Sequence, residues 1–158
     1  MIPFLLLAFS VPTYSTAPRA SAPLPKALSA CMALPRADVE SALGRKLNPP
    51  EESNAARTST CDYSADHALV TVTLTRLAGE VNLPSEIAAL QREIEGSSSR
   101  PAPGFGATAF FLDVPGGGTQ LHLIHGNDYV MVSVLGFGDA AAVAPAAERM
   151  MRSALGRL

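Results

Sequence analysis

The chain has no tryptophan, and aromatic residues make up only 6% of its 158 residues. Few side chains are therefore available for stacking on bases or sugar rings. Charged residues are scarce too, at 16%, and the 12 Lys and Arg residues are scattered along a chain of net charge −2. A nucleic-acid-binding protein carries a clustered basic surface, so we expect no nucleic-acid partner. No apolar run reaches the roughly 18 residues that span a bilayer, so we expect no transmembrane helix in the mature chain.

Motifs for catalysis and for cofactor binding are also missing. Gly-x-Ser-x-Gly does not occur, and the two cysteines lack Cys-x-x-Cys spacing. Neither glycine-rich stretch, 103–106 or 115–118, leads into a predicted helix that could bind a phosphate. Serine hydrolysis, dithiol redox chemistry and zinc binding therefore lack support. We expect a protein that is not an enzyme and that has no cofactor and no catalytic residues.

The N-terminus of the chain is typical of an exported protein. Residues 4–11 are apolar, and small and proline-rich residues follow them. We predict a signal peptide over 1–22, with an uncertain boundary, and a Pro/Ala-rich tether over 23–30. The first residues contain no Lys or Arg, so a cytosolic protein with an apolar N-terminus stays an alternative. The expected location is the periplasm or the extracellular space.

The two cysteines, Cys31 and Cys61, allow more than one interpretation. The stretch 28–31 reads Leu-Ser-Ala-Cys, a pattern that is cut in bacterial lipoproteins, which would make Cys31 a lipid anchor. A lipid-attachment site follows the apolar stretch directly, whereas here four prolines lie between that stretch and Cys31. We therefore disfavour the lipid anchor and predict a disulfide between Cys31 and Cys61. Free thiols in the cytosol are the remaining alternative.

Hydrophobic periodicity predicts a single α+β domain over 31–158. The expected helices cover 34–47, 83–96 and a segment from 139 or 144 to the C-terminus. The expected strands are 59–64, 68–76, 106–114, 119–125 and 128–136. The order is α-β-β-α-β-β-β-α, which predicts an antiparallel sheet of about five strands with helices mainly on one face. The stretches 61–77 and 121–137 echo each other weakly as hairpins followed by a helix, which suggests an internal duplication.

The strand over 68–76 carries the main functional hypothesis. Apolar residues alternate with threonines, so Thr71, Thr73 and Thr75 point away from the core. One face of the sheet would then be open to solvent. We therefore expect the domain to bind a protein or a small ligand through an open sheet face, with these three threonines as candidate binding residues.

The histidines suggest a different class of function. His67 and His125 each follow a strand at a hairpin turn, with Asp66 and Asp128 nearby. If they lay at one edge of the sheet, they could serve a hydrolase or a metal-dependent enzyme. Within 121–125, strand alternation sends His122 and His125 to opposite faces, so these two are poorly placed to share a metal. A structural component of the cell envelope, without a diffusible ligand, is a third possibility.

Several of these features together resemble a known group of proteins. The chain has Cys-Met-Ala-Leu-Pro-Arg-Ala-Asp-Val-Glu-Ser-Ala-Leu-Gly over 31–44, then Cys-Asp-Tyr-Ser over 61–64. The strand Val-Thr-Val-Thr-Leu over 70–74 and an Ala-rich last helix follow. This pattern is similar to small uncharacterised bacterial exported proteins and lipoproteins, over roughly 31–158. The resemblance implies export and pairing of the two cysteines, and it implies no reaction.

Overall fold

The computed structural model describes residues 29–158, so the predicted signal peptide and the tether up to residue 28 lie outside the described residues. Helices and antiparallel strands alternate in this part, which confirms the α+β class. Seven strands form one sheet in the order β1-β2-β3-β7-β6-β5-β4. No helix within residues 29–158 is long and apolar enough to cross a membrane.

Two edge strands extend the sheet beyond the five strands that the sequence predicts. The strands are β1 (Glu51–Ala55), β2 (Thr58–Ala65), β3 (Ala68–Arg76), β4 (Ser98–Pro101), β5 (Ala109–Asp113), β6 (Gly118–His125) and β7 (Asp128–Leu135). The strands β1 and β4 lie where the sequence predicts loops, so the prediction of about five strands is wrong. Both strands are polar and mostly exposed, and backbone pairing to β2 and β5 holds them. Such edge strands carry no hydrophobic alternation, which is why the sequence pattern missed them.

The helices differ from the prediction mainly near the N-terminus. They are α1 (Ala30–Ala33), α2 (Arg36–Leu43), α3 (Leu83–Glu93) and α4 (Ala140–Leu155), with a short 3₁₀ helix η1 (Pro103–Phe105). Pro35 has an extended ψ of 149° and is the N-cap of α2, so the helix predicted over 34–47 covers only Arg36–Leu43. The short helix α1 lies before it, where the sequence predicts no helix. Gly44 ends α2 with a φ of +66°, a left-handed conformation that glycine adopts without strain.

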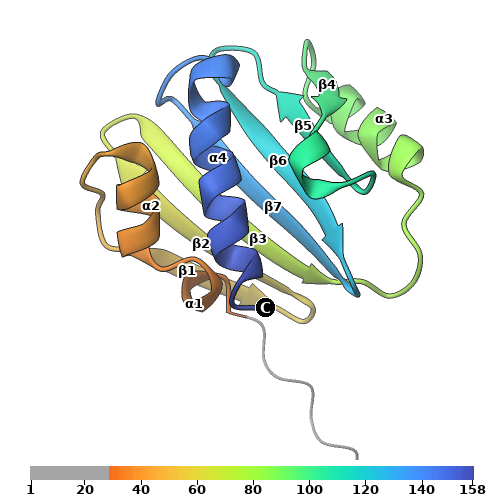
Figure 1. Ribbon diagram of the computed structural model, residues 1–158, viewed down its shortest axis with the longest axis horizontal. Helices are drawn as coiled ribbons and strands as arrows, with labels where there is room; N and C mark the ends of the chain where they lie inside the picture. Colours follow the sequence, from red (N-terminus) through yellow and green to blue (C-terminus); the bar gives the residue numbers. More distant parts are fainter. Residues whose placement is uncertain (1–28) are drawn as a thin grey trace, which may run out of the picture.

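The main core lies between one sheet face and the helices α1, α2 and α4. Figure 1 shows α4 lying across the middle of the sheet with α2 beside it. On β3, Val70, Val72 and Leu74 are fully buried in this core, and each contributes about 1.5–3 kcal/mol by burial. Met150 and Met151 of α4 are buried against them. The alternation of β3 therefore fixes which face carries the threonines.

The remaining helix, α3, lies on the opposite face. Three helices therefore cover one face of the sheet and one helix covers part of the other. Gln91 of α3 donates a hydrogen bond of 3.5 Å to the hydroxyl of Ser99. Ser99 pairs with Leu112 across the ladder, and both point away from the core side chain of Phe111. Phe110 and Leu112 are buried on this second face. Figure 1 shows α3 next to β4, at the other end of the sheet from α2. The second face is thus covered near β4, β5 and β6 and open at β1, β2, β3 and β7.

The two central hairpins repeat each other at a fixed spacing. The strands β6 and β7 begin 60 residues after β2 and β3, respectively. Val72 and Val132, which have the same spacing, are direct partners in the middle of the sheet. A local twofold axis therefore passes through this pair and relates the hairpins. The helices that follow lie on opposite faces, so the repeat ends with the hairpins, and duplication stays a prediction.

Candidate functional site

The predicted threonine row lies on the open part of the second face. Thr71, Thr73 and Thr75 alternate with the buried residues of β3 and are half-buried. Their hydroxyls meet partners on β2: Thr75 lies 3.1 Å from Thr58, and Thr73 lies 3.4 Å from Thr60. Thr71 donates a hydrogen bond of 2.6 Å to the carboxylate of Asp62. Cross-strand pairs of this kind stabilise a sheet by about 0.2–1 kcal/mol each, and they hold the row in a fixed geometry.

The rest of this surface carries very little charge. We define the open face as the outward side chains of the three strands β2, β3 and β7: Thr58, Thr60, Asp62, Ser64, Leu69, Thr71, Thr73, Thr75, Tyr129, Met131, Ser133 and Leu135. Asp62 is the one charged member, and Lys and Arg are absent from this set. Leu69 is 36% exposed, and Met131 and Leu135 are half-buried beside the threonines. Hydroxyl and apolar groups therefore form a continuous surface over β2, β3 and β7, and the exposed Glu51 of the edge strand β1, opposite Asp62, adds a second carboxylate at its border.

A buried aromatic cluster borders the open face beneath α3. The ring of His122 stacks on Phe110 with a centroid distance of 4.6 Å and an interplanar angle of 3°. Its Nδ1 lies 2.8 Å from the hydroxyl of Tyr129, and its Nε2 lies 3.1 Å from Oε1 of Gln120. Since Oε1 only accepts, Nε2 carries the proton and Nδ1 accepts from Tyr129. The side chain of His122 thus lies between neighbouring strands and is only 1% exposed.

Burial sets the ionisation of this cluster. Desolvation lowers the pKa of His122 to about 4, so the imidazole is neutral at pH 7. Burial also raises the pKa of Tyr129, with a further contribution from the carboxylate of Glu86 on α3. Both groups stay uncharged over the physiological range. The cluster is therefore a neutral hydrogen-bonded unit on the second face, and the sequence did not single it out because its members come from three strands.

The structure does not bring the predicted histidine pair together. His67 lies at the turn that precedes β3, whereas His125 pairs with Asp128 beside the far end of β3. The nine residues of β3 separate the two histidines by about 25 Å. A shared metal ion would lie about 2 Å from a ring nitrogen of each histidine, so the two cannot form one metal site. No three His, Cys, Asp or Glu side chains within residues 29–158 lie close enough to hold a metal.

The two aspartates of that hypothesis each pair with an arginine. Asp66 lies 3.6 Å from Arg45, and both side chains are largely exposed. Asp128 lies 2.5 Å from Arg76 and links the ends of β3 and β7. The two ion pairs lie at opposite ends of the strands. Each aspartate therefore pairs with an arginine, and the two do not share a histidine.

The predicted disulfide is confirmed. Cys31 in α1 is bonded to Cys61 in β2, with a Cα–Cα distance of 5.1 Å. In this structure the thiol of Cys31 is therefore not available for lipid attachment. The backbone N–H of Ala30 donates to the hydroxyl of Ser59 at 2.9 Å, next to the disulfide. The hydroxyl of Tyr63 also donates to the carbonyl of Leu34. The short helix α1 is thus attached to β2 at several points.

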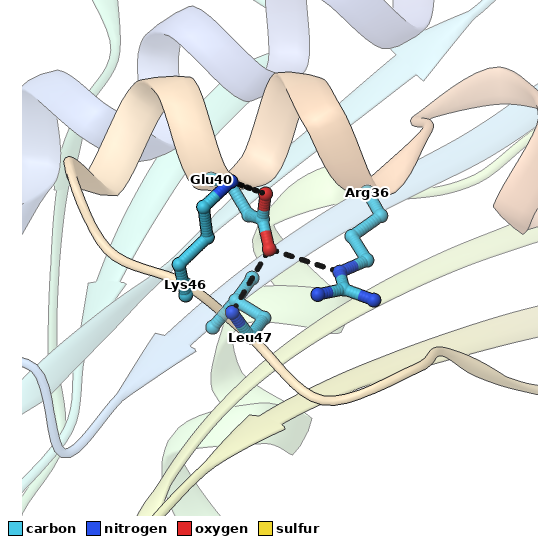
Figure 2. A network of polar contacts seen from close by, with 4 residues as sticks. All are labelled: Arg36, Glu40, Lys46 and Leu47. Atoms are coloured by element: carbon cyan, nitrogen blue, oxygen red, sulfur yellow. Dashed lines mark hydrogen bonds and ion pairs between the residues drawn. The ribbon is translucent and has the colours of Figure 1, made fainter.

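Carboxylates stabilise the N-terminal part of the domain. Glu52 accepts hydrogen bonds from the hydroxyls of Ser29, at 2.7 Å, and Ser59, at 3.2 Å, which lower its pKa. Figure 2 shows a second network, in which Glu40 accepts from the N–H of Leu47 at 3.0 Å and pairs with Arg36 and Lys46. The Leu47 contact and then the Lys46 contact lower the pKa of Glu40 to about 2. This network fixes the chain reversal after α2.

Comparisons of the chain with protein-family models, with curated proteins and with solved structures gave no match.

Proposed function

We propose that this protein is an exported, non-enzymatic domain that binds a partner protein through its open face. The observation that carries this proposal is the composition of that face. Four side chains from each of β2, β3 and β7 are exposed or half-buried there, apart from the buried Ser133, and Asp62 alone is charged. A sheet face that only meets water carries polar residues, and the exposed Leu69 and half-buried Met131 and Leu135 on this face depart from that pattern.

The chemistry of the open face suits a protein surface. Charged residues are depleted in the centres of protein interfaces, and Tyr and Met are enriched there. Tyr129, Met131 and Leu69 provide apolar contact area on two neighbouring strands. The threonine hydroxyls can still accept or donate hydrogen bonds to a partner. The cross-strand contacts order these groups before binding, which reduces the entropy lost on association.

Site-specific photocrosslinking tests this binding surface. A photoreactive amino acid is placed at Thr73, in the middle of the open face, and at Ser41, an exposed position on α2. In the cells that produce the protein, we expect one discrete crosslinked partner from position 73 and none from position 41. The substitution Thr60→Lys, on the neighbouring strand, should reduce that crosslink by about tenfold or more, because a buried unpaired charge opposes binding.

Two outcomes would contradict the binding proposal. Equal crosslinking from positions 73 and 41 would mean that the open face has no preference for a partner. The absence of any crosslink would favour a structural role in the cell envelope. Circular dichroism of the Thr60→Lys variant must show an intact fold, because Thr60 also contacts Thr73 within the sheet.

Export is tested separately by the intact mass of the protein from an exporting bacterial host. We expect the mature chain to begin near residues 16–23 and to gain two alkyl groups only after reduction, since Cys31 and Cys61 are paired. A chain that retains residue 1 would contradict export. A chain that begins at Cys31 with acyl groups attached would instead identify a lipoprotein.

A further inference from the structure

A cavity that the open face does not include lies at the C-terminal end of α4. It has a volume of about 520 Å³ and lies between η1, the end of β6 and the last turn of α4. Ligand pockets in proteins commonly have volumes of about 300–1,000 Å³. Its apolar side chains come from Phe105, Leu123, Ile124 and Leu155, and its polar ones from Thr108, His125 and Arg152. Its lining contains no Asp or Glu.

The guanidinium of Arg152 is held in position at this cavity. It lies over the ring of Phe105, 4.6 Å from the ring centroid, and donates to Glu148 at 3.0 Å. Gly104 allows this approach, because a Cβ there would lie 3.2 Å from Nη2 of Arg152. Among residues 29–158, Glu148 is the only hydrogen-bond partner of this side chain. Several N–H donors of the guanidinium therefore remain for an anion.

The nearby end of α4 does not cancel this positive charge. The last carbonyls of a helix carry partial negative charge and would disfavour an anion. Here Gly156 and Arg157 donate their backbone N–H groups to the carbonyls of Arg152 and Ala154. The side chain of Arg157 donates to the carbonyl of Ser153 at 2.9 Å. These carbonyls are paired, and the exposed ring of His125 adds a second donor at the cavity.

We propose that this cavity binds a small aliphatic carboxylate. The carboxylate would pair with Arg152 and accept a hydrogen bond from His125, and the hydrocarbon chain would lie against Phe105, Leu123 and Leu155. Arginine is the side chain best suited to a carboxylate, since its fork of donors can bind both oxygens. The apolar residues give the chain a surface to cover. The carboxylate of Glu148, outside the lining, binds the guanidinium through Nη2 and leaves its other N–H groups for the ligand. This site is independent of the open face and lies on the helix side of the sheet.

Calorimetric titration of the full chain with octanoate at pH 7 tests this proposal, with 1-octanol as the uncharged probe. We expect saturable octanoate binding in the millimolar range or tighter, and 1-octanol binding about tenfold weaker. Arg152→Gln should weaken octanoate binding about tenfold and leave 1-octanol binding unchanged. Arg92→Gln, on the exposed side of α3, is the matched control and should bind octanoate like the unmodified chain.

The proposal also predicts that a negative charge placed in the cavity prevents binding. Leu155→Glu places a carboxylate beside Arg152 and should abolish octanoate binding while the protein stays folded, because Leu155 lies at the end of α4. No saturable heat up to the solubility limit of octanoate would overturn the proposal. Equal binding by the Arg152→Gln and Arg92→Gln variants would overturn it too, because the carboxylate would then not be recognised.

Discussion

Reduction of the Cys31–Cys61 disulfide should lower the free energy of unfolding by about 3–4 kcal/mol, the chain-entropy value for a closed loop of 30 residues. The disulfide restricts the unfolded chain, and it also holds α1 against β2. The loss is a large part of the roughly 5–15 kcal/mol by which domains of this size are stable. Urea unfolding of the full chain, followed by circular dichroism with and without reductant, measures it.

The double variant Cys31→Ala/Cys61→Ala is the control for this measurement. Its unfolding midpoint should not respond to reductant, and it should lie close to that of the reduced unmodified chain. Hydrogen exchange should also become faster at the amides of Ala33 and Leu34, which bond within α1 to Ser29 and Ala30. An unmodified chain whose midpoint does not change, although its thiols are shown to be reduced, would contradict the prediction.

The hairpins could be predicted from the sequence because their side chains alternate so clearly. On β3, apolar residues fill one face and threonines the other, and the predicted bounds 68–76 match the strand. The same alternation placed Thr71, Thr73 and Thr75 away from the core. By contrast, β1 and β4 are exposed and polar, so only their backbone pairing identifies them, and that depends on the fold as a whole.

The extent of the open face could not be predicted, because it depends on which strands become neighbours. The central pair of β3 and β7 joins segments about 60 residues apart, and this pair puts Met131 beside Thr73. The position of α3 could not be predicted from the sequence either. Its apolar stripe predicts a covered surface, but the sequence does not tell which face it covers. The cavity near Arg152 likewise joins residues from η1, β6 and α4.

The free energy of unfolding should depend strongly on pH, because His122 is buried in the aromatic cluster. This is the second large expected effect. In the folded protein the pKa of His122 is about 4, whereas the ordinary value is 6.5. Between these values the unfolded chain binds a proton that the folded chain does not, so acid favours unfolding. This group should lower the free energy of unfolding by about 2 kcal/mol between pH 7 and pH 5 and by about 3 kcal/mol at pH 4.

The variant His122→Phe isolates this contribution. A phenyl ring can keep the stack on Phe110, but it leaves Tyr129 and Gln120 without a partner, so the variant should be less stable at pH 7 by about 1–3 kcal/mol. The decisive quantity is therefore the slope of stability against pH, measured by urea unfolding from pH 7 to pH 5. We expect the slope to be nearly flat in this variant, and the control His67→Gln, at an exposed turn, to keep the slope of the unmodified chain.

The pH window separates this histidine from the carboxylates. Glu40, with a pKa of about 2 against an ordinary 4.5, contributes stability that is lost only as the pH falls below about 4.5. Glu52 and Asp38 also have lowered pKa values and act in the same acid range. A loss of stability above pH 5 therefore belongs to His122. If His122→Phe kept that loss, a different group would have to take up the proton, and burial of a neutral His122 would not be its cause.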